Sequence, residues 1–198
     1  LATIAVSAQL TSPQAAGARL YAEATVSPFA AWPLSQLLAS ARALDLSALW
    51  SDAPQTQISG QARIDTRGLD LPISASVTLA NAQAGRWDER RLPVAALELD
   101  LSGRADQRDR LTLHRFELRA PGDGGRATGQ GEWKGGTATL DVSLHAVKPA
   151  AVDNRAPAMT LSGTLGSRWI GLPSPGGSAA LSDRVQVQSR LALEGRLD

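Results

Sequence analysis

The sequence predicts an all-β fold in which an elongated, curved antiparallel sheet keeps one apolar face. Apolar and polar residues alternate through most of the chain, as they do in strands whose successive side chains point to opposite faces. Clusters of Gly, Pro, Asn and Asp separate the alternating segments at the short intervals of an all-β chain. One sequence element also recurs at a fixed interval, which is typical of proteins that stack repeated units.

The alternation begins near the start of the chain and continues to its end. It occupies residues 4–10, 20–26, 73–79, 97–101 and 138–144, and residues 185–197 hold one phase with small interruptions at Ser189 and Gly195. Strands with one apolar side are half-buried and antiparallel, whereas strands of a parallel α/β sheet are apolar on both sides. The alternation changes phase between Leu113 and Phe116, which predicts a β-bulge there.

Residues 34–50 differ from the rest, because their apolar positions follow a spacing close to 3.6. These positions are Leu34, Leu37, Leu38, Ala41, Leu44 and Leu49. Coming after Pro33 and Ser35, this spacing predicts one short helical segment in an otherwise all-β chain. Trp32 and Trp50 flank the segment, and we expect them to pack it onto one end of the sheet.

The recurring element combines a short loop or helical turn, an Ala-Pro bend and a strand that begins with an apolar residue, Ser and Gly. Its second copy follows the first by 103 residues, as from Pro54 to Pro157 and from Gly60 to Gly163. We therefore expect residues 1–198 to form a single segment with repeat units at about 44–146 and 147–198, the second incomplete. Units that cannot bury their apolar face alone must stack on their neighbours, which favours an elongated sheet.

The composition favours a thin or open apolar layer. Hydrophobic residues make up 43% of the chain but aromatic residues only 4%, and small side chains fill a thick core poorly. The periodicity alone leaves two arrangements open, since the apolar faces can close on each other as a sandwich or line an open groove. In the open arrangement the lining residues would be Ile4, Val6, Ile73, Val77, Leu97, Leu99, Leu140, Val142, Val187 and Leu191.

The sequence offers no residues for catalysis, and we expect neither an enzyme nor a metal or cofactor site. The chain has no cysteine, and its two histidines, His114 and His145, lack metal-ligand spacing and are expected at the surface. The glycine clusters at 122–125 and 176–177 lack a following phosphate-binding helix, so we expect hairpin turns. A net charge of +1 with interspersed signs predicts no nucleic-acid partner. No apolar run is long enough to cross a membrane as a helix.

Residues 79–94 carry a resemblance to a known family. The run Leu79-Ala80-Asn81-Ala82-Gln83-Ala84-Gly85-Arg86-Trp87-Asp88, followed by Arg91-Leu92-Pro93-Val94, is similar to a repeat pattern of the AsmA-like proteins, most closely the TamB family. That family provides the inner-membrane component of the translocation and assembly module. Gly129-x-Gly131 and the Ala-Pro…Leu-Ser-Gly element also resemble its repeats. The chain lacks the family's anchor helix and its terminal partner-binding part, so the resemblance implies an internal segment.

The resemblance implies a taco-shaped β-groove with an apolar interior, in the periplasm of a Gram-negative bacterium. The full-length protein would be anchored in the inner membrane and would meet an Omp85-type outer-membrane partner. Its groove would conduct phospholipids by contact with their acyl chains, support outer-membrane protein assembly, or do both. The alternative is a protein-binding scaffold that accepts outer-membrane protein strands by β-augmentation. The resemblance favours the open groove over the closed sandwich.

Overall fold

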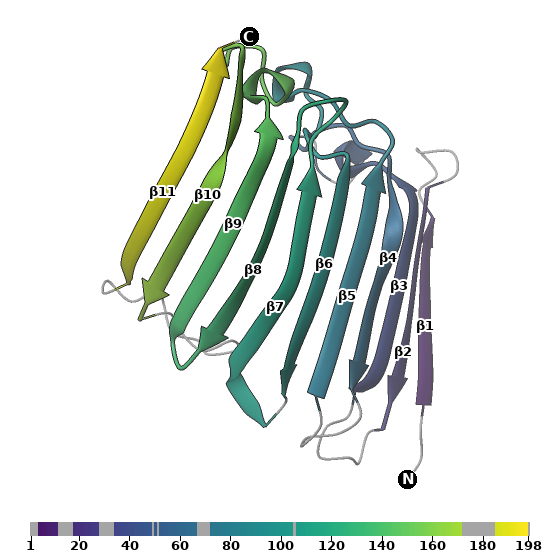
Figure 1. The fold of residues 1–198 in the computed structure, drawn as a ribbon. Coiled ribbons are helices and arrows are strands. Elements are labelled where there is room, and N and C mark those ends of the chain that lie inside the picture. Colours follow the sequence, from purple (N-terminus) through teal and green to yellow (C-terminus); the bar gives the residue numbers. More distant parts are fainter. Residues whose placement is uncertain are drawn as a thin grey trace.

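The computed structural model describes residues 4–11, 18–27, 34–48, 50, 52–66, 72–104, 106–171 and 185–197. These residues form eleven strands and three short 3-10 turns (Figure 1). The strands are β1 Ile4–Thr11, β2 Arg19–Val26, β3 Leu34–Leu44, β4 Ile58–Thr66, β5 Pro72–Asn81, β6 Ala96–Arg104, β7 Gln107–Arg119, β8 Arg126–Lys134, β9 Thr137–Val147, β10 Met159–Ile170 and β11 Gln186–Leu197. The turns are η1 Leu46–Ala48, η2 Trp87–Glu89 and η3 Pro149–Ala151.

All eleven strands belong to one antiparallel sheet whose spatial order is the order of the chain, from β1 to β11. The sheet does not close, because within the described residues each strand pairs only with its sequence neighbours. The three 3-10 turns lie at one end of the strands, which we call the loop end; the opposite end, with the β6–β7 and β8–β9 turns, is the hairpin end (Figure 1). The prediction of an all-β, curved antiparallel sheet is confirmed.

The strand register separates apolar from polar side chains across the whole sheet. One row that crosses every strand contains Ala8, Ala22, Ala39, Ala62, Val77, Leu99, Phe116, Gly129, Val142, Leu165 and Leu191. A parallel row, nearer the loop end, contains Leu20, Ala41, Gly60, Leu79, Leu97, Leu118, Ala127, Leu144, Gly163 and Leu193. We call the side of the sheet that carries these rows the apolar face.

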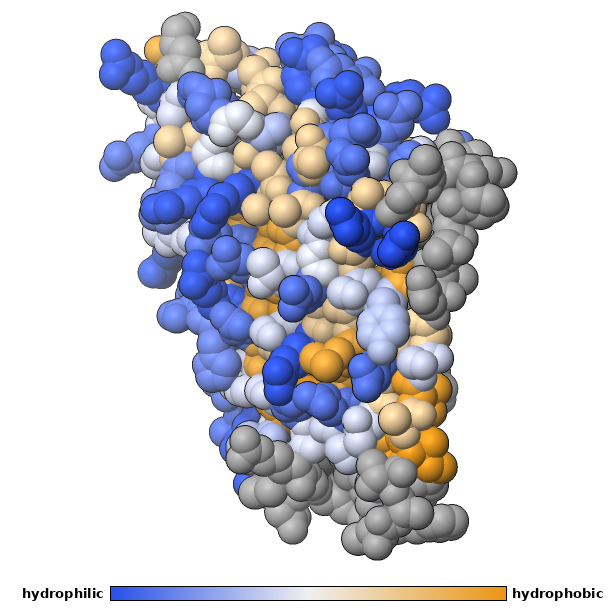
Figure 2. Space-filling view, turned by 90° about the vertical axis from the view of Figure 1, so that its right-hand side faces the viewer, coloured by the Kyte–Doolittle hydropathy of each residue, from blue (hydrophilic) through white to orange (hydrophobic). Residues whose placement is uncertain are grey.

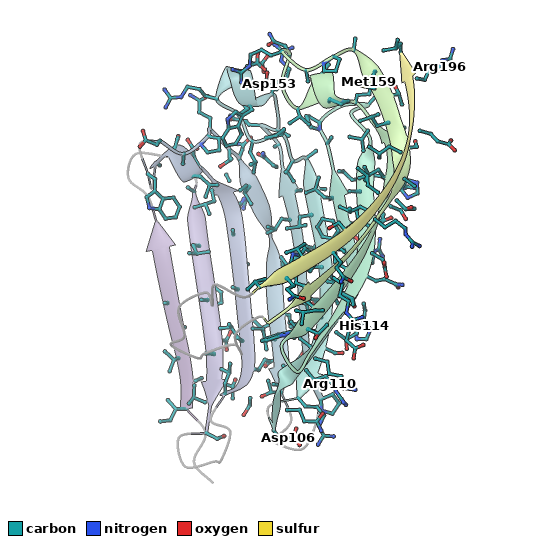
Figure 3. All side chains as sticks on the ribbon, turned by 90° about the vertical axis from the view of Figure 1, so that its left-hand side faces the viewer. Asp106, Arg110, His114, Asp153, Met159 and Arg196 are labelled. Carbon is teal, nitrogen blue, oxygen red and sulfur yellow. The ribbon has the colours of Figure 1, made fainter. Side chains whose placement is uncertain are left out.

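The opposite side, the outer face, carries most of the charged residues. Its registered positions include Glu23, Arg63, Asp100, Arg115, Glu132, Arg168 and Arg196. Seen from the β1 side, hydrophilic residues form the left-hand outline, and hydrophobic residues show between them and the right-hand side (Figure 2). Seen from the β11 side, Arg110, His114 and Arg196 project outward from the curved sheet (Figure 3). The apolar face therefore lies inside the curve.

Residues 34–44 form the strand β3, so the prediction of a helical segment over residues 34–50 was wrong. Only η1, three residues long, has helical geometry there. Two register shifts explain the misleading spacing: one between β2 and β3 near Leu34, and one between β3 and β4 after Ala41. Each shift adds a residue to β3 and brings positions three apart onto one face, which imitates a helical period. Pairing with strands on both sides then outweighs local helix preference.

The flanking tryptophans do not support the helical segment either. Trp50 is 65% exposed and does not pack onto the sheet, contrary to the expectation from its position. Trp32 and Leu49 lie outside the described residues. By contrast, the phase change between Leu113 and Phe116 is a register shift between β7 and β8, so the bulge predicted there is confirmed.

The 103-residue interval in the sequence has a counterpart in backbone geometry. Ala43 and Ala146 both have positive φ, 49° and 48°. Each lies in a β-bulge, where the register shifts between β3 and β4 or between β9 and β10. In each bulge the alanine N–H donates to a serine hydroxyl of the next strand, Ser59 at 2.9 Å and Ser162 at 3.0 Å. The turns η1 and η3 follow at the same interval. The sequence repeat therefore corresponds to a repeated β-bulge. In each copy the serine hydroxyl stabilises a positive-φ conformation that alanine otherwise avoids.

Asn81 joins three segments at the loop end. Its Oδ1 accepts hydrogen bonds from the N–H groups of Gln57 (2.9 Å) and Gln83 (3.2 Å), and its Nδ2 donates to the carbonyl of Val94 (3.2 Å). The residue is only 8% exposed. All these contacts use the asparagine amide, so Asn81 has a structural role: it holds the loop ahead of β4 and residues 82–95 against the sheet.

We expect Asn81→Ala to lower the free energy of unfolding by about 2 kcal/mol, because the buried asparagine amide is lost and the backbone groups of Gln57 and Val94 lose their partner in it. Denaturant unfolding followed by circular dichroism would measure the change. Asn154→Ala is the matched control, since this exposed side chain lies on a neighbouring loop, and it should cost less than about 0.5 kcal/mol. Equal losses in the two variants would contradict the role of Asn81.

Candidate functional site

The apolar face has no second layer over it within the described part of the chain. Ala18 is the only buried hydrophobic residue there, whereas a closed sandwich of this size would bury many. Large apolar residues near both edges are strongly exposed, including Val6 at 53% and Leu191 at 58%. Of the two arrangements that the sequence left open, the described strands adopt the uncovered one. The result is an apolar groove open to solvent.

All ten predicted lining residues lie on the apolar face. Val77, Leu99, Val142 and Leu191 share the row that crosses every strand, and Leu97 lies in the adjacent row. The remaining five are distributed between other rows and the edge strands. Val6 and Leu140 belong to a third row, Ile73 and Val187 to a fourth nearer the hairpin end, and Ile4 pairs with Val26.

Several large members of the apolar face were not among the predicted residues. The register adds Leu111, Phe116, Leu118, Trp133, Leu144, Leu165 and Trp169. Phe116 and Leu118 follow the β7 bulge, and once that bulge is placed their alternation identifies them. The tryptophans could have been found by extending the alternation from Gly131 to Trp133 and from Leu165 to Trp169. They bring most of the aromatic surface of the groove to the hairpin end.

At the loop end, the segment that follows η2 folds over the apolar face. Leu92 and Val94 face Ile58, Leu79 and Leu97 across a hollow of about 170 Å³. The carbonyl of Leu92 accepts from the N–H of Gly85, and that of Val94 accepts from Asn81. Because these polar groups already have partners, the hollow offers a ligand apolar contact only.

Near the hairpin end, two polar atoms of the apolar face have no hydrogen-bond partner. They are Nε1 of Trp133 and Oγ of Ser167, both buried. Ser167 itself is 9% exposed. Buried donors without partners are uncommon in native proteins, because the lost hydration is not replaced. They are the two buried side-chain atoms without a hydrogen-bond partner among the described residues.

The outer face is held by ion pairs between neighbouring strands and within them. Glu117 is 7% exposed and accepts from Arg115 and Arg119, each at 2.8 Å, while Arg115 also reaches Glu98 at 2.9 Å. The hydrogen bonds from Arg115 and then Arg119 hold the pKa of the Glu117 carboxyl below its usual value. This cluster stiffens the middle of the sheet on the side that faces away from the groove.

We expect acid to weaken the fold partly through Glu117. Its folded pKa lies below its unfolded value, so its contribution to stability is present above the unfolded pKa of about 4.5 and is lost as the pH falls below it. The free energy of unfolding, measured from about pH 6 to about pH 3, should therefore decrease. Glu117→Gln should reduce this decrease. An unchanged pH dependence in the variant would contradict the assignment.

The histidines and glycine clusters have no catalytic arrangement in the described residues. His114 and His145 are both exposed, and their Nε2 atoms contact the hydroxyls of Ser102 and Thr128. Gly122–Gly125 form the tight turn between β7 and β8, whereas residues 176–177 lie outside the described residues. No group of three His, Asp or Glu side chains able to hold a metal ion occurs in the ranges that the structure covers.

Within the described ranges, the candidate site is therefore the apolar surface of the sheet. Among the described residues, no helix has the length and apolarity needed to cross a membrane. No family model matches this chain, and no curated protein or solved structure is measurably similar to it.

Proposed function

We propose that this chain is a segment of a TamB-like, AsmA-type bridging protein whose apolar β-groove carries the acyl chains of phospholipids between two membranes. In this proposal the full-length protein is anchored in the inner membrane, crosses the periplasm and meets an Omp85-type partner in the outer membrane. The segment acts without catalysis, metal or cofactor. The observation that carries the proposal is a continuous apolar face over eleven strands, which no second layer covers in the part of the chain that the structure describes.

The apolar surface continues from strand to strand without interruption. In the two long rows that include Val77 and Leu97, no polar side chain interrupts the apolar surface between β2 and β11. Burying one methylene group contributes about 0.8 kcal/mol, so a long acyl chain in full contact would gain on the order of 10 kcal/mol before entropy costs. A ligand held only by such contacts meets equivalent surface as it moves from strand to strand. The groove can then conduct lipid as well as bind it.

Site-specific photo-crosslinking tests the proposal directly. A photoreactive amino acid at Val77, Leu99 or Val142 would face the groove, whereas one at Thr139 or Asp141 would face outward from exposed positions. Val142 and Asp141 are adjacent in β9, so they make a matched pair. After incubation with phospholipid vesicles, lipid adducts should form from the three inward positions only. Equal labelling of both sets, or labelling of neither, would refute lipid conduction.

The free sheet edges favour a second candidate function, the binding of outer-membrane protein strands by β-augmentation. Every described position of β11 is exposed, and neither β1 nor β11 has a partner on its outer side within the described residues. Unpaired edge groups can pair with an incoming strand. Charged residues at Arg190, Glu194 and Arg196 reduce the tendency of β11 to act as an indiscriminate edge.

Peptides with the sequence of outer-membrane protein β-strands would separate the two candidates. If the edge is the functional surface, such peptides should bind and should protect the backbone amides of β11 from hydrogen exchange. Phospholipid should not compete with them. Peptides that bind only to the apolar face and are displaced by phospholipid would instead favour the lipid groove.

A further inference from the structure

The strand β11 forms one edge of the sheet and is exposed along its whole length. It pairs with β10 on one side, and in the described part of the chain no strand lies on its other side (Figure 1). All twelve of its positions are exposed, and its apolar side chains strongly so, with Val187 at 55% and Leu197 at 78%. The backbone groups on the free side of such a strand can pair with one further strand.

The sequence of β11 is nearly symmetric about Ala192. On the apolar face, residues of similar size lie at equal distances before and after it, namely Leu191 with Leu193, Ser189 with Gly195, and Val187 with Leu197. On the outer face, the residues at equal distances are Arg190 with Glu194, which have opposite charges, and Gln188 with Arg196. The strand is therefore complementary to a reversed copy of itself in size and in charge.

An antiparallel pair of two identical strands uses this symmetry. When the two-fold axis passes through Ala192, each residue lies opposite the residue of the second copy that has the same distance from Ala192 on the other side. Arg190 of each copy then faces Glu194 of the other, so two ion pairs form across the edge. On the apolar face, each large side chain meets a large side chain. Within one chain these charges are free for this purpose, since the described residues give Arg190 and Glu194 no ion pair.

Neighbouring registers lose this complementarity. With the axis one residue away, at Leu191 or Leu193, the opposite charges no longer face each other. With the axis two residues away, at Arg190 or Glu194, two identical charges face each other, which is destabilising. The charges thus select a single register among the five. The strand β1, at the other edge of the sheet, has no charged residue in its sequence and provides no such selection.

We propose that two copies of this chain pair through β11, antiparallel, with Ala192 at the two-fold axis. This axis stands perpendicular to the sheet, because antiparallel pairing of identical edges reverses the strand direction and keeps the same face upward. Both copies then present the apolar face on one side, and the groove continues from one copy into the other. The inference does not depend on lipid conduction. A strand of another protein would have to compete with the second copy for this edge.

Charge reversal tests the register. Arg190→Glu places two carboxylates opposite each other at two symmetric positions, and Glu194→Arg does the same with two guanidinium groups. Each variant should weaken dimerisation about 10- to 100-fold, because every change acts twice in a two-fold dimer. The double variant Arg190→Glu/Glu194→Arg restores opposite charges and should dimerise as the wild-type protein does. Sedimentation equilibrium measures the dissociation constant, and circular dichroism checks the fold, which exposed positions should leave intact.

Ala192→Cys tests the position of the axis with every charge in place. The chain has no cysteine of its own. At the axis, the two new thiols would be within reach of a disulfide, because opposed Cα atoms in an antiparallel pair lie about 4.5–5.5 Å apart. Mild oxidation should therefore give a covalent dimer. Gln188→Cys is the matched control on the same face of the same strand, since its two thiols would lie about 27 Å apart along the paired strands and should not cross-link.

Three outcomes would overturn the inference. Wild-type protein that stays monomeric throughout the micromolar range would show that the edge does not self-associate. A dimer that neither single charge reversal weakens would use another surface, such as the apolar face. A dimer that the double variant does not restore, or equal cross-linking at positions 188 and 192, would exclude this register. None of these outcomes concerns lipid binding, which the photo-crosslinking experiment tests separately.

Discussion

Gly60→Ala and Gly163→Ala should each lower the free energy of unfolding by about 3 kcal/mol, the upper end of the usual cost of overpacking. A Cβ atom at Gly60 would lie 2.1 Å from the carbonyl oxygen of Thr78, and one at Gly163 would lie 2.1 Å from that of Ala192. These contacts are with the backbone of the next strand, which cannot move without breaking its pairing. The two glycines occupy the same place in the two repeat units, beside the bulge that holds Ala43 or Ala146.

Gly166→Ala provides the control within the same strand as Gly163. A Cβ atom there would meet only the Oδ1 of Asp141, at 3.3 Å, which is the end of a side chain that can turn away. We expect its cost to stay below about 0.5 kcal/mol, as for most surface changes. Denaturant unfolding of the three variants measures the difference. Similar stability for Gly163→Ala and Gly166→Ala would show that the bulged strands can relax, and would refute the rigid fit.

Val142→Asp and Leu99→Asp should weaken phospholipid binding roughly 100-fold, because an acyl chain in the groove would have to displace water from a carboxylate. Both positions lie in the row that crosses all eleven strands. In the absence of lipid the groove is open, so the new charge stays hydrated and the fold should survive. A displacement titration with a fluorescent lipid measures the affinity, and circular dichroism reports the fold.

Thr139→Asp is the corresponding control for Val142→Asp. It places the same charge in the same strand, but on the exposed outer face. Lipid affinity should be unchanged in this variant. If both variants bind as the wild-type protein does, the apolar face does not contact lipid. If both variants lose binding equally, the added charge acts on the whole protein, and the row that contains Val142 is not a specific lipid contact.

The strands that sequence reasoning identified share a simple alternation, and the one it missed does not. Residues 138–144 alternate without interruption, and they form the middle of β9. In β3, extra residues at two register shifts place Leu34, Leu37, Ala41 and Leu44 on one face at spacings of three and four. That spacing belongs to a helix when only the sequence is read. Residues 34–44 form a strand because they pair with β2 and β4, and these partners are not adjacent to them in the sequence.

The alternation of apolar and polar residues also could not predict that the groove is open. Alternation indicates that a face is apolar, but whether something covers it depends on the positions of all other elements. Here each strand contacts only its neighbouring strands in the described sheet, so no described strand folds back over Val77 or Leu99. The unpaired donors of Trp133 and Ser167 were hidden for a similar reason. A tryptophan and a serine in alternating strands are ordinary residues until the register places both on the apolar side.

The interval between the repeated bulges spans six strands, from β3 to β9. Because six is even, the second bulge begins from a strand of the same direction and presents the same face. Duplication of one such unit in the gene would therefore lengthen the sheet by about 29 Å, the width of six paired strands, without turning its lining outward. The reach of such a protein can change in whole steps during evolution. It can then follow a change in the distance to be crossed, while each existing strand keeps its neighbours.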